Sequence, residues 1–388
     1  MLSLKEHFLL NPEITFLNFG SFGACPKEIF SDYQHWQLQL EREPIQFMLK
    51  HGPAQLQKSK EALGSFINCD ADDIVFTTNP SYAMNIVAAS LQLKPGDEIL
   101  TTDLEYGAMD RTWNFHSKKN GYTYKRQPIR LPLLSKEDFI NQFWQGLTDR
   151  TKVIFISQIT SSTALILPAE EICARAKELG LLVIVDGAHV PGHIPLNLSK
   201  LQADIYTGAC HKWMLTPKGN SFLYANKKSQ AWMNPLVVSW GYESVAPSNS
   251  KFQDYHQQQG TRDFSAFLTI PAALEFRQKH QWEIISSDCK KLVTDNIERF
   301  AKLLNTQPLA PITNDFYGQM CSLEIKSKQP EALKQELYSK YQIEIPIMVH
   351  DNRVYIRYSI NAFNNSQDLD KLYAALSKII AENKLITS

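Results

Sequence analysis

Short apolar runs alternate with stretches of helical periodicity between residues 70 and 225, and this alternation limits the fold more than any other feature of the chain. The runs with the length and β-branched content of strands are Ile74 to Thr77, EILTTD, TKVIFISQ, LLVIVDGAH and ADIYTGACHK. Strands that alternate with helices form a mostly parallel sheet with helices on both faces. We therefore predict an α/β fold built on such a sheet.

The carboxyl ends of these predicted strands indicate where a ligand site should lie, because open parallel sheets bind ligands at that edge. The residues at or beside those ends are Thr77, Asp103, Ser157, Val185 and Thr207. One helix start in this region is well marked, since Asn79 is a suitable N-cap and Pro80 suits the first helical position.

The pattern changes after about residue 265. A long helical stretch over 270–304 precedes two strands, FYGQMCSLEIK and RVYIRYSI, and a last helix in DLDKLYAALSKIIAENK. This order predicts a smaller α+β domain. We expect an N-terminal segment, 1–25, that packs with the small domain and the pocket, then a large domain over 26–262 and a small domain over 263–388.

Composition excludes several classes of protein. Lysine plus arginine and aspartate plus glutamate are 40 each, so the zero net charge gives no preference for nucleic acid or acidic lipid. No window reaches the ~18 apolar residues of a spanning helix, and the start resembles neither a signal nor a transit peptide. We expect a cytoplasmic protein without nucleic-acid or membrane partners. The six cysteines have no metal-type or redox-type spacing, so we expect reduced, mostly buried thiols.

Asp186 ends an apolar strand, and Lys212 lies in the turn after the next strand. A carboxylate and a lysine so placed suit pyridoxal phosphate, whose aldehyde forms an imine with lysine and whose ring nitrogen needs an acidic partner. Taken alone, the pair is more often a capping aspartate and a surface lysine. His189 and His193 have a spacing found in metal sites, but Pro191 and Gly192 between them prevent a regular helix, so we expect no metal.

Seven segments in order resemble the class V aminotransferase family of pyridoxal phosphate enzymes with fold type I. They are LNFGSFGACP, FTTNPSYAMN, DLEYGA, SQITSSTALILP, the region from VDGAH to TGACHKW and TPKG, QQGTRDFSAF, and IEIPIMVHDNRVYIRYSINAFNN. The HKW and PKG forms are nearer to isopenicillin N epimerase-like members than to the cysteine desulfurases. The resemblance implies a large domain that binds pyridoxal 5'-phosphate, a smaller α+β domain and a homodimer that acts on a small amino-acid substrate.

The resemblance also implies roles for residues around the cofactor ring. Lys212 matches the imine lysine and proton shuttle, and Asp186 matches the partner of the pyridine nitrogen. His189 and Ser161 fall where the family places polar groups against the phenolic oxygen. Tyr106 stands where desulfurases carry a histidine stacked on the ring, and it is a candidate proton donor on the second face.

For the phosphate, the resemblance implies His211, Thr207 and the helix start that follows residue 78, where Asn79, Ser81 and Tyr82 stand. Pro80 departs from the family pattern because it has no N–H, which leaves the amides of Ser81 and Tyr82 as donors. Gly260 and Thr261 match a turn that reaches the phosphate of the neighbouring subunit, so we expect shared active sites.

For the substrate, Arg357 in YIRYS resembles the arginine that pairs with the α-carboxylate through two parallel hydrogen bonds. Phe22 and Gly23 are expected to line the same pocket.

Several reactions share this machinery. The leading interpretation is epimerisation or racemisation at Cα, with Lys212 and Tyr106 on opposite faces. The alternative is a C–S lyase that eliminates sulfur from a cysteine derivative or its sulfoxide. Aminotransfer ranks third. A persulfide-forming desulfurase is disfavoured because no cysteine follows Cys321. A catalytically inactive binding protein of the same fold is disfavoured because the lysine, the aspartate and the arginine are all retained.

Overall fold

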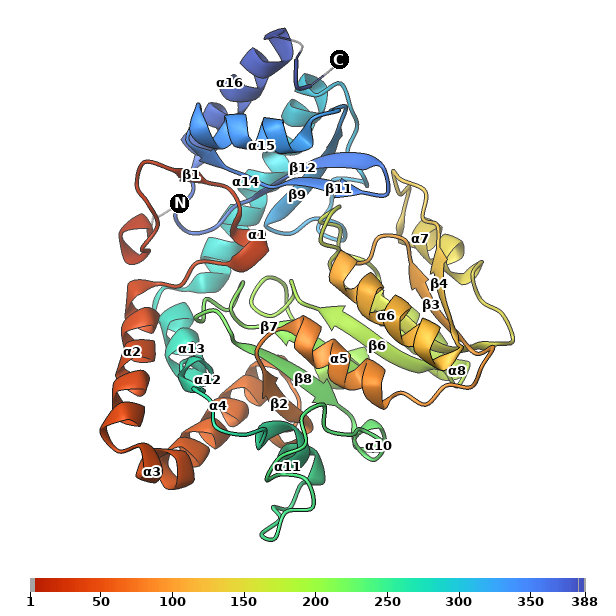
Figure 1. Cartoon of the computed structure of the whole chain (residues 1–388). Helices are drawn as coiled ribbons and strands as arrows, with labels where there is room; N and C mark the ends of the chain where they lie inside the picture. The colour runs from red at the N-terminus through yellow and green to blue at the C-terminus, as the bar shows by residue number, and fades with distance from the viewer. Residues whose placement is uncertain (1–3, 383, 387–388) are drawn as a thin grey trace.

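A computed structural model describes residues 4–382 and 384–386. Its centre is a seven-stranded sheet (Figure 1). The strand order is β2 (Ile74–Thr77), β8 (Ser221–Ala225), β7 (Ile205–Ala209), β6 (Leu182–Gly187), β5 (Thr151–Ser157), β3 (Glu98–Thr102) and β4 (Thr123–Gln127). β8 pairs antiparallel with both of its neighbours and the other pairings are parallel, so the predicted α/β fold with a mostly parallel sheet is confirmed.

Apolar side chains project from both faces of this sheet, which explains the unbroken apolar runs of its strands. On β5, Val153 and Phe155 join one buried cluster, whereas Ile154 and Ile156 join the other. The first cluster lies under α5 (Pro80–Ser90) and α6 (Gly107–Asn120), which cross the sheet in front in Figure 1. The second cluster includes residues of α8 (Ala169–Glu178) and continues into the small domain.

Helix starts follow ordinary capping chemistry. The side chain of Asn79 accepts a hydrogen bond from the Tyr82 amide at 2.9 Å, and Pro80 is the first residue of α5, as predicted. Ser135 caps α7 (Lys136–Trp144) in the same way. The shorter helices of the large domain are α9 (Leu198–Leu201), α10 (Lys227–Gln230) and α11 (Lys251–Gln257).

The N-terminal segment extends along both domains. It contains η1 (Lys5–His7), β1 (Thr15–Phe16) and α1 (Phe19–Phe22). The large domain then begins with α2 (Lys27–Arg42), α3 (Pro44–Gln46), η2 (Phe47–His51), α4 (Gly52–Ile67) and η3 (Ala71–Asp73). β1 pairs in parallel with β10 (Ile343–Glu344) of the small domain. α2 ends at Arg42, and Pro44 is the first residue of α3.

The small domain is built on a three-stranded antiparallel sheet in the order β11 (Ile347–His350), β12 (Arg353–Ser359), β9 (Met320–Ile325). Its helices are α14 (Trp282–Leu303), α15 (Pro330–Ser339) and α16 (Ser366–Glu382). Asn383, in the predicted last helix, lies outside the described residues, as do 1–3 at the start of the N-terminal segment.

The single long helix predicted over 270–304 is wrong. The chain forms two helices, α13 (Ile270–Lys279) and α14, because Gln281 takes a left-handed conformation with φ of 49° that breaks the backbone ladder. α13 and the short α12 (Ser265–Leu268) pack on α2 and α4. The sequence around the break stays amphipathic, so periodicity alone does not reveal it.

All six cysteines lie in the described part of the chain and are free thiols, four buried and two partly exposed, as predicted. No helix in the described residues is both long enough and apolar enough to cross a bilayer.

Candidate active site

A cavity of about 680 Å³ opens at the carboxyl edge of the sheet, where the strand pattern predicts a ligand site. Segments that follow β2, β3, β5, β6 and β7 line it, and α1, β11 and β12 close it from the small-domain side. It brings together most of the predicted site residues: Phe22, Asn79, Ser81, Tyr106, Ser161, Asp186, His189, His211, Lys212 and Arg357. We call it the active-site cavity.

Lys212 and Asp186 lie in this cavity at the ends of neighbouring strands. The Lys212 amine is 3.3 Å from Nε2 of His189. Burial and the charge of Arg357 lower the pKa of Lys212, which favours the neutral, nucleophilic amine. Burial raises the pKa of Asp186, whose Oδ1 accepts the Ala188 amide at 2.9 Å. A buried acid of this kind suits a cationic ring nitrogen, because the attraction between the two charges offsets part of the cost of burying them.

His189 has a ring nitrogen ready for a ligand. Its Nδ1 is buried and has no hydrogen-bond partner among the described residues, and such an orphaned group is costly unless a ligand satisfies it. Burial and the nearby Lys212 keep the pKa of His189 well below its ordinary value, so the ring is neutral. An unsatisfied neutral imidazole beside Lys212 and Asp186 fits a flat, polar, aromatic ring such as pyridoxal.

The phosphate end of the predicted site is arranged around the start of α5. Ser81 and the exposed Asn79 line the cavity there. The Tyr82 amide, expected to be a phosphate donor, is instead bound to the Asn79 side chain, and the Tyr82 hydroxyl donates to Gln259 at 2.9 Å. The N-terminus of a helix remains a site that favours anions.

His211 and Thr207, the other predicted phosphate residues, differ in position. Nδ1 of His211 donates to the Asn220 carbonyl at 2.8 Å, and burial lowers the pKa of His211 to about 4. Its Nε2 remains for a ligand in the cavity. Thr207 does not line the cavity: its hydroxyl donates to the Phe222 carbonyl at 2.8 Å, inside the sheet. Side chains alternate across a strand, so a residue near a strand end can face away from the site.

Arg357 reaches the cavity from β12 of the small domain and is only 1% exposed. Its guanidinium donates to the Ser161 carbonyl at 2.6 Å and to the Ser21 hydroxyl at 2.9 Å. Its Nε has no partner, and no carboxylate of the described chain pairs with it. Ser161, predicted to face the cofactor oxygen, is thus also in contact with the arginine. A buried guanidinium without an anion is a suitable receptor for a substrate carboxylate.

The predicted pair Phe22 and Gly23 divides between two tasks. Phe22 is 70% exposed at the cavity wall. Gly23 does not line the cavity, but it packs against the turn that carries Lys212. A Cβ at Gly23 would lie 2.3 Å from the His211 carbonyl oxygen, and φ is +65° there, so both space and backbone require glycine.

Gly260 and Thr261 are exposed and lie outside the cavity of their own chain. Their contribution to a neighbouring subunit stays a prediction.

Ser21, Lys218 and Met348 are among the cavity residues that the sequence did not single out. Lys218 stands in the quoted TPKG segment, and its amine donates to the Gly23 carbonyl at 3.3 Å. Ser21 and Met348 come from segments far from the sheet in sequence, so only tertiary structure brings them here. His193 uses both ring nitrogens within the protein, with the His189 carbonyl and the Gln319 amide. The described residues contain no group of three potential metal ligands.

Glu105, which precedes Tyr106, is a fully buried acid behind the cavity. One of its oxygens accepts from the amide and the hydroxyl of Ser157, at 3.0 and 2.5 Å, and the other accepts from Thr102 at 2.7 Å. Ser157 lines the cavity and is in register with Asp186 on the next strand. Burial raises the pKa of Glu105 to about 8, and the nearby Asp186 adds to this effect.

We predict that Glu105 makes the stability of the fold depend on pH. Because its pKa is raised above the ordinary 4.5, the folded chain keeps a proton that the unfolded chain loses. Stability therefore falls as pH rises from about 4.5 to about 8, by up to ~1.4 kcal/mol per pH unit. Glu105→Gln should remove this component. Urea unfolding at several pH values measures the difference in slope between the two proteins, and identical slopes would show that Glu105 is ionised in the fold.

The sheet, the cavity at its carboxyl edge and the lysine–aspartate pair at adjacent strand ends define the chain as a protein of the fold type I class. The family model "Aminotransferase class-V" matches residues 27–372, and the chain belongs to this family. Isopenicillin N epimerases from Amycolatopsis lactamdurans and Streptomyces clavuligerus are 29% and 31% identical to it, over 97% of this chain and 97% and 98% of theirs. A probable L-cysteine desulfhydrase from Arabidopsis thaliana is 26% identical over 97% of this chain and 85% of its own.

Among solved structures, a cysteine desulfurase from Thermococcus onnurineus has a TM-score of 0.83 at 18% identity, with 98% of each chain covered, which supports the fold. The protein is therefore a pyridoxal phosphate-dependent enzyme of the class V aminotransferase family. The cavity residues fit this cofactor. Lys212 would bind its aldehyde, Asp186 its ring nitrogen, His189 its ring oxygen, and His211 and the start of α5 its phosphate.

Proposed function

We propose that this protein is an amino-acid epimerase or racemase that acts at Cα. The observation that carries the proposal is that one cavity contains a buried amine, a tyrosine hydroxyl and a carboxylate receptor, supplied by Lys212, Tyr106 and Arg357. Inversion at carbon needs one group that removes a proton and another that returns it on the opposite face. The 31% identity to an isopenicillin N epimerase agrees with this assignment.

Each residue has a separate task in the proposed reaction. Pyridoxal phosphate, when bound, supplies an electron-accepting ring that makes the Cα proton acidic. Arg357 binds the α-carboxylate and so fixes the orientation of Cα. Asp186 holds the charge of the ring nitrogen, and the Lys212 amine takes the proton from one side. Tyr106, at the start of α6, donates a proton on the other side.

The second candidate is a C–S lyase that eliminates sulfur from a cysteine derivative or its sulfoxide. Tyr106 is 45% exposed, and an exposed phenol is a weaker candidate for a proton donor than a desolvated one. Elimination needs Lys212 but no second donor. The relative described as a cysteine desulfhydrase also favours this candidate. None of the described cavity residues is a cysteine, which disfavours persulfide chemistry. Aminotransfer and a catalytically inactive binding protein have no observation of their own in their favour.

Incubation with L-amino acids and S-substituted cysteines in deuterated water separates these candidates. An epimerase gives the D-isomer with α-deuterium and no pyruvate, whereas a lyase gives pyruvate and ammonia. We predict that Tyr106→Phe lowers the rate of inversion by about 10²-fold or more, because it removes the second proton donor. Exchange by Lys212 on the first face should persist in this variant. If inversion in Tyr106→Phe is as fast as in the wild type, the second donor is another group.

The proposed enzyme is a homodimer with shared sites. A loop over 236–245 exposes Leu236, Val237, Val238, Trp240, Tyr242 and Val245, of which Trp240 is 81% exposed. A cluster of exposed apolar residues usually marks an interface. The Gly241 amide of this loop donates to the Gln258 carbonyl, so the loop adjoins the turn that contains Gly260 and Thr261.

We predict that Trp240→Asp converts the dimer to a monomer and weakens cofactor binding, because the turn of each subunit would no longer reach the other site. Light scattering measures the mass, and absorbance titration measures the affinity for the cofactor. Tyr338→Asp is a matched control, since Tyr338 is 46% exposed on α15, away from this loop. A wild-type protein that is monomeric at micromolar concentration would contradict the proposal.

A further inference from the structure

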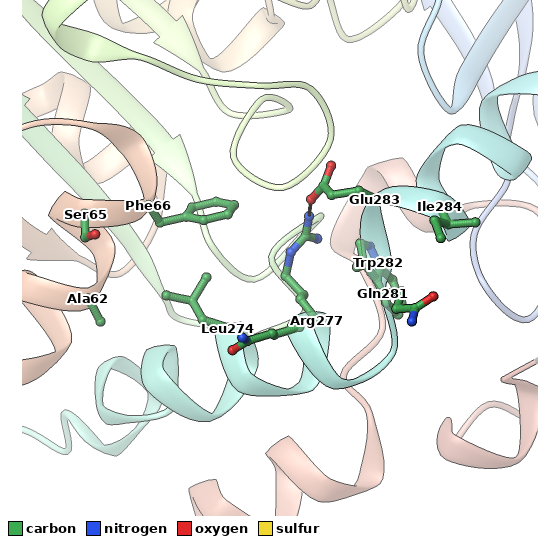
Figure 2. Close-up of a pocket in the computed structure, with 10 residues that line it drawn as sticks. Ala62, Ser65, Phe66, Leu274, Arg277, Gln281, Trp282, Glu283 and Ile284 are labelled. Atoms are coloured by element: carbon green, nitrogen blue, oxygen red, sulfur yellow. Dashed lines mark hydrogen bonds and ion pairs between the residues drawn. The ribbon is translucent and has the colours of Figure 1, made fainter.

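A second cavity, of about 460 Å³, lies between α4, α13 and the start of α14. Figure 2 shows the Arg277 side chain rising from α13, with Phe66 and Leu274 on one side and Trp282 on the other. None of the residues that line this second cavity lines the active-site cavity. We call it the Arg277 cavity.

Arg277 is a buried cation that donates hydrogen bonds to two loops of the active site from the side away from the active-site cavity. Its Nη1 donates to the Gly192 carbonyl at 3.2 Å and to the Trp213 carbonyl at 3.0 Å. Trp213 directly follows Lys212, and Gly192 belongs to the loop that follows β6, the strand that contains Asp186. The side chain is 5% exposed, and burial lowers the pKa of Arg277 only to about 10, so it stays charged at neutral pH.

The carboxylate that pairs with Arg277 is exposed to solvent. Glu283 accepts from Nη2 of Arg277 at 3.2 Å, yet its own side chain is 82% exposed (Figure 2). Ion pairs with so exposed a partner contribute little, because water and salt compete for the carboxylate. In the described part of the chain, no other carboxylate pairs with Arg277. Another anion could therefore take the place of Glu283 on Arg277.

The hydrogen-bond pattern of Arg277 leaves one edge of the guanidinium for a ligand. Nη1 is occupied by two carbonyls, whereas Nε has no hydrogen bond in the described structure and Nη2 has one. The Nε and Nη2 protons form the edge that binds a carboxylate through two parallel bonds. The guanidinium carbon also lies 5.6 Å from the ring centre of Phe66 and 5.7 Å from that of Trp282, so aromatic walls flank the charged edge.

We propose that the Arg277 cavity binds a small monocarboxylate with an apolar or aromatic body, which takes the place of Glu283 on Arg277. The carboxylate pairs with the Nε and Nη2 edge, and the body packs against Phe66, Leu274 and Trp282. A volume of 460 Å³ with apolar walls and one fixed charged group is typical of a small-molecule site. The Arg277 guanidinium would then bind both the ligand and the carbonyl of Trp213, the residue that follows Lys212. The proposal does not depend on the reaction that the enzyme catalyses.

Calorimetric titration of the cofactor-loaded enzyme with benzoate tests this proposal, and benzamide serves as the uncharged probe. We expect benzoate to bind at least about tenfold more tightly than benzamide, because a buried charge pair is lost with the amide. Glu283→Gln should tighten benzoate binding about threefold or more, because it removes the competing carboxylate. Since Glu283 is exposed, this variant should fold normally.

Two arginine variants locate the binding site. Arg277→Lys keeps the charge but loses the two-pronged edge, and it should weaken benzoate binding. Arg357→Ala removes the carboxylate receptor of the active-site cavity, and it should leave benzoate binding at the Arg277 cavity intact. Loss of binding in Arg357→Ala would place benzoate in the active site and overturn the proposal. Equal affinity for benzoate and benzamide, or unchanged affinity in Glu283→Gln, would also overturn it.

Discussion

Lys212→Ala should abolish turnover while the protein still folds. We propose two tasks for the Lys212 amine at the same position, the covalent attachment of the cofactor and the movement of the Cα proton. Its pKa is lowered by burial and by Arg357, so more of the amine is neutral and able to accept a proton. Loss of a positioned general base alone costs about 10²–10⁴ in rate, so we expect a loss of ~10³-fold or more. The measurement is the steady-state rate on the best substrate found in the panel.

The fold of the variant is checked independently of its activity. Removing a buried amine should not lower the melting temperature, because the side chain lies in the cavity wall and has His189 as its one hydrogen-bond partner in the described chain. Lys58→Ala on α4 is a matched control, since Lys58 is exposed and lies outside the cavity. Borohydride should fix the cofactor on the wild type and on the control but not on Lys212→Ala. Multiple turnovers by Lys212→Ala would refute the assignment.

The position of the active site could be predicted because it depends on the sheet alone. Apolar, β-branched runs give the strands, and their order along the chain gives a parallel sheet whose carboxyl edge must hold the ligand. Asp186 and Lys212 end or follow two such strands, so the same rule brings them together. Neighbouring parallel strands bring the residues at and just after their carboxyl ends close together.

Arg357 and Ser21 could not be placed in this way. Both come from outside the sheet, on β12 and α1, and a pattern of strands and helices does not fix how a second domain packs on the first. The sequence indicates Arg357 only through the family resemblance. Contacts between segments more than 300 residues apart depend on side-chain packing throughout the core, which a local pattern does not contain.

The sequence also could not predict which hydrogen-bond donors in the site are already used by the fold. Thr207 and Tyr82 were expected to bind the phosphate. In the structure the Thr207 hydroxyl donates to the Phe222 carbonyl, and the Tyr82 amide donates to the Asn79 side chain. A backbone or hydroxyl donor near a ligand is available only if the fold has not already satisfied it. Glu105 and Arg277 show the reverse case, since charged residues that look like surface groups in the sequence are buried behind the cavity.

The charges around the active-site cavity favour an anionic group on a bound ligand. Apart from Lys212, whose lowered pKa favours the neutral amine, Arg357 and Lys218 line the cavity, and Asp186 is the one acid among its described lining residues. Asp186 is predicted to hold the ring nitrogen, and the start of α5 offers a site for the phosphate. Arg357 then remains as a buried cation with no internal anion, which is unfavourable until a carboxylate binds.

Arg357→Ala should therefore reduce kcat/KM for carboxylate substrates, mostly through KM. Truncation of one partner of a buried charge pair costs about 2–5 kcal/mol, which corresponds to a reduction between ~30-fold and several-thousand-fold. Arg353→Ala on the same strand is the control, since Arg353 pairs with Glu324 outside the cavity and its loss should change kcat/KM less than about threefold. An α-carboxamide analogue should react equally with wild type and Arg357→Ala. If the variant unfolds, Arg357→Lys provides the comparison, because it keeps the charge but loses the parallel hydrogen bonds. A KM change below threefold in a folded variant would mean that the carboxylate binds elsewhere.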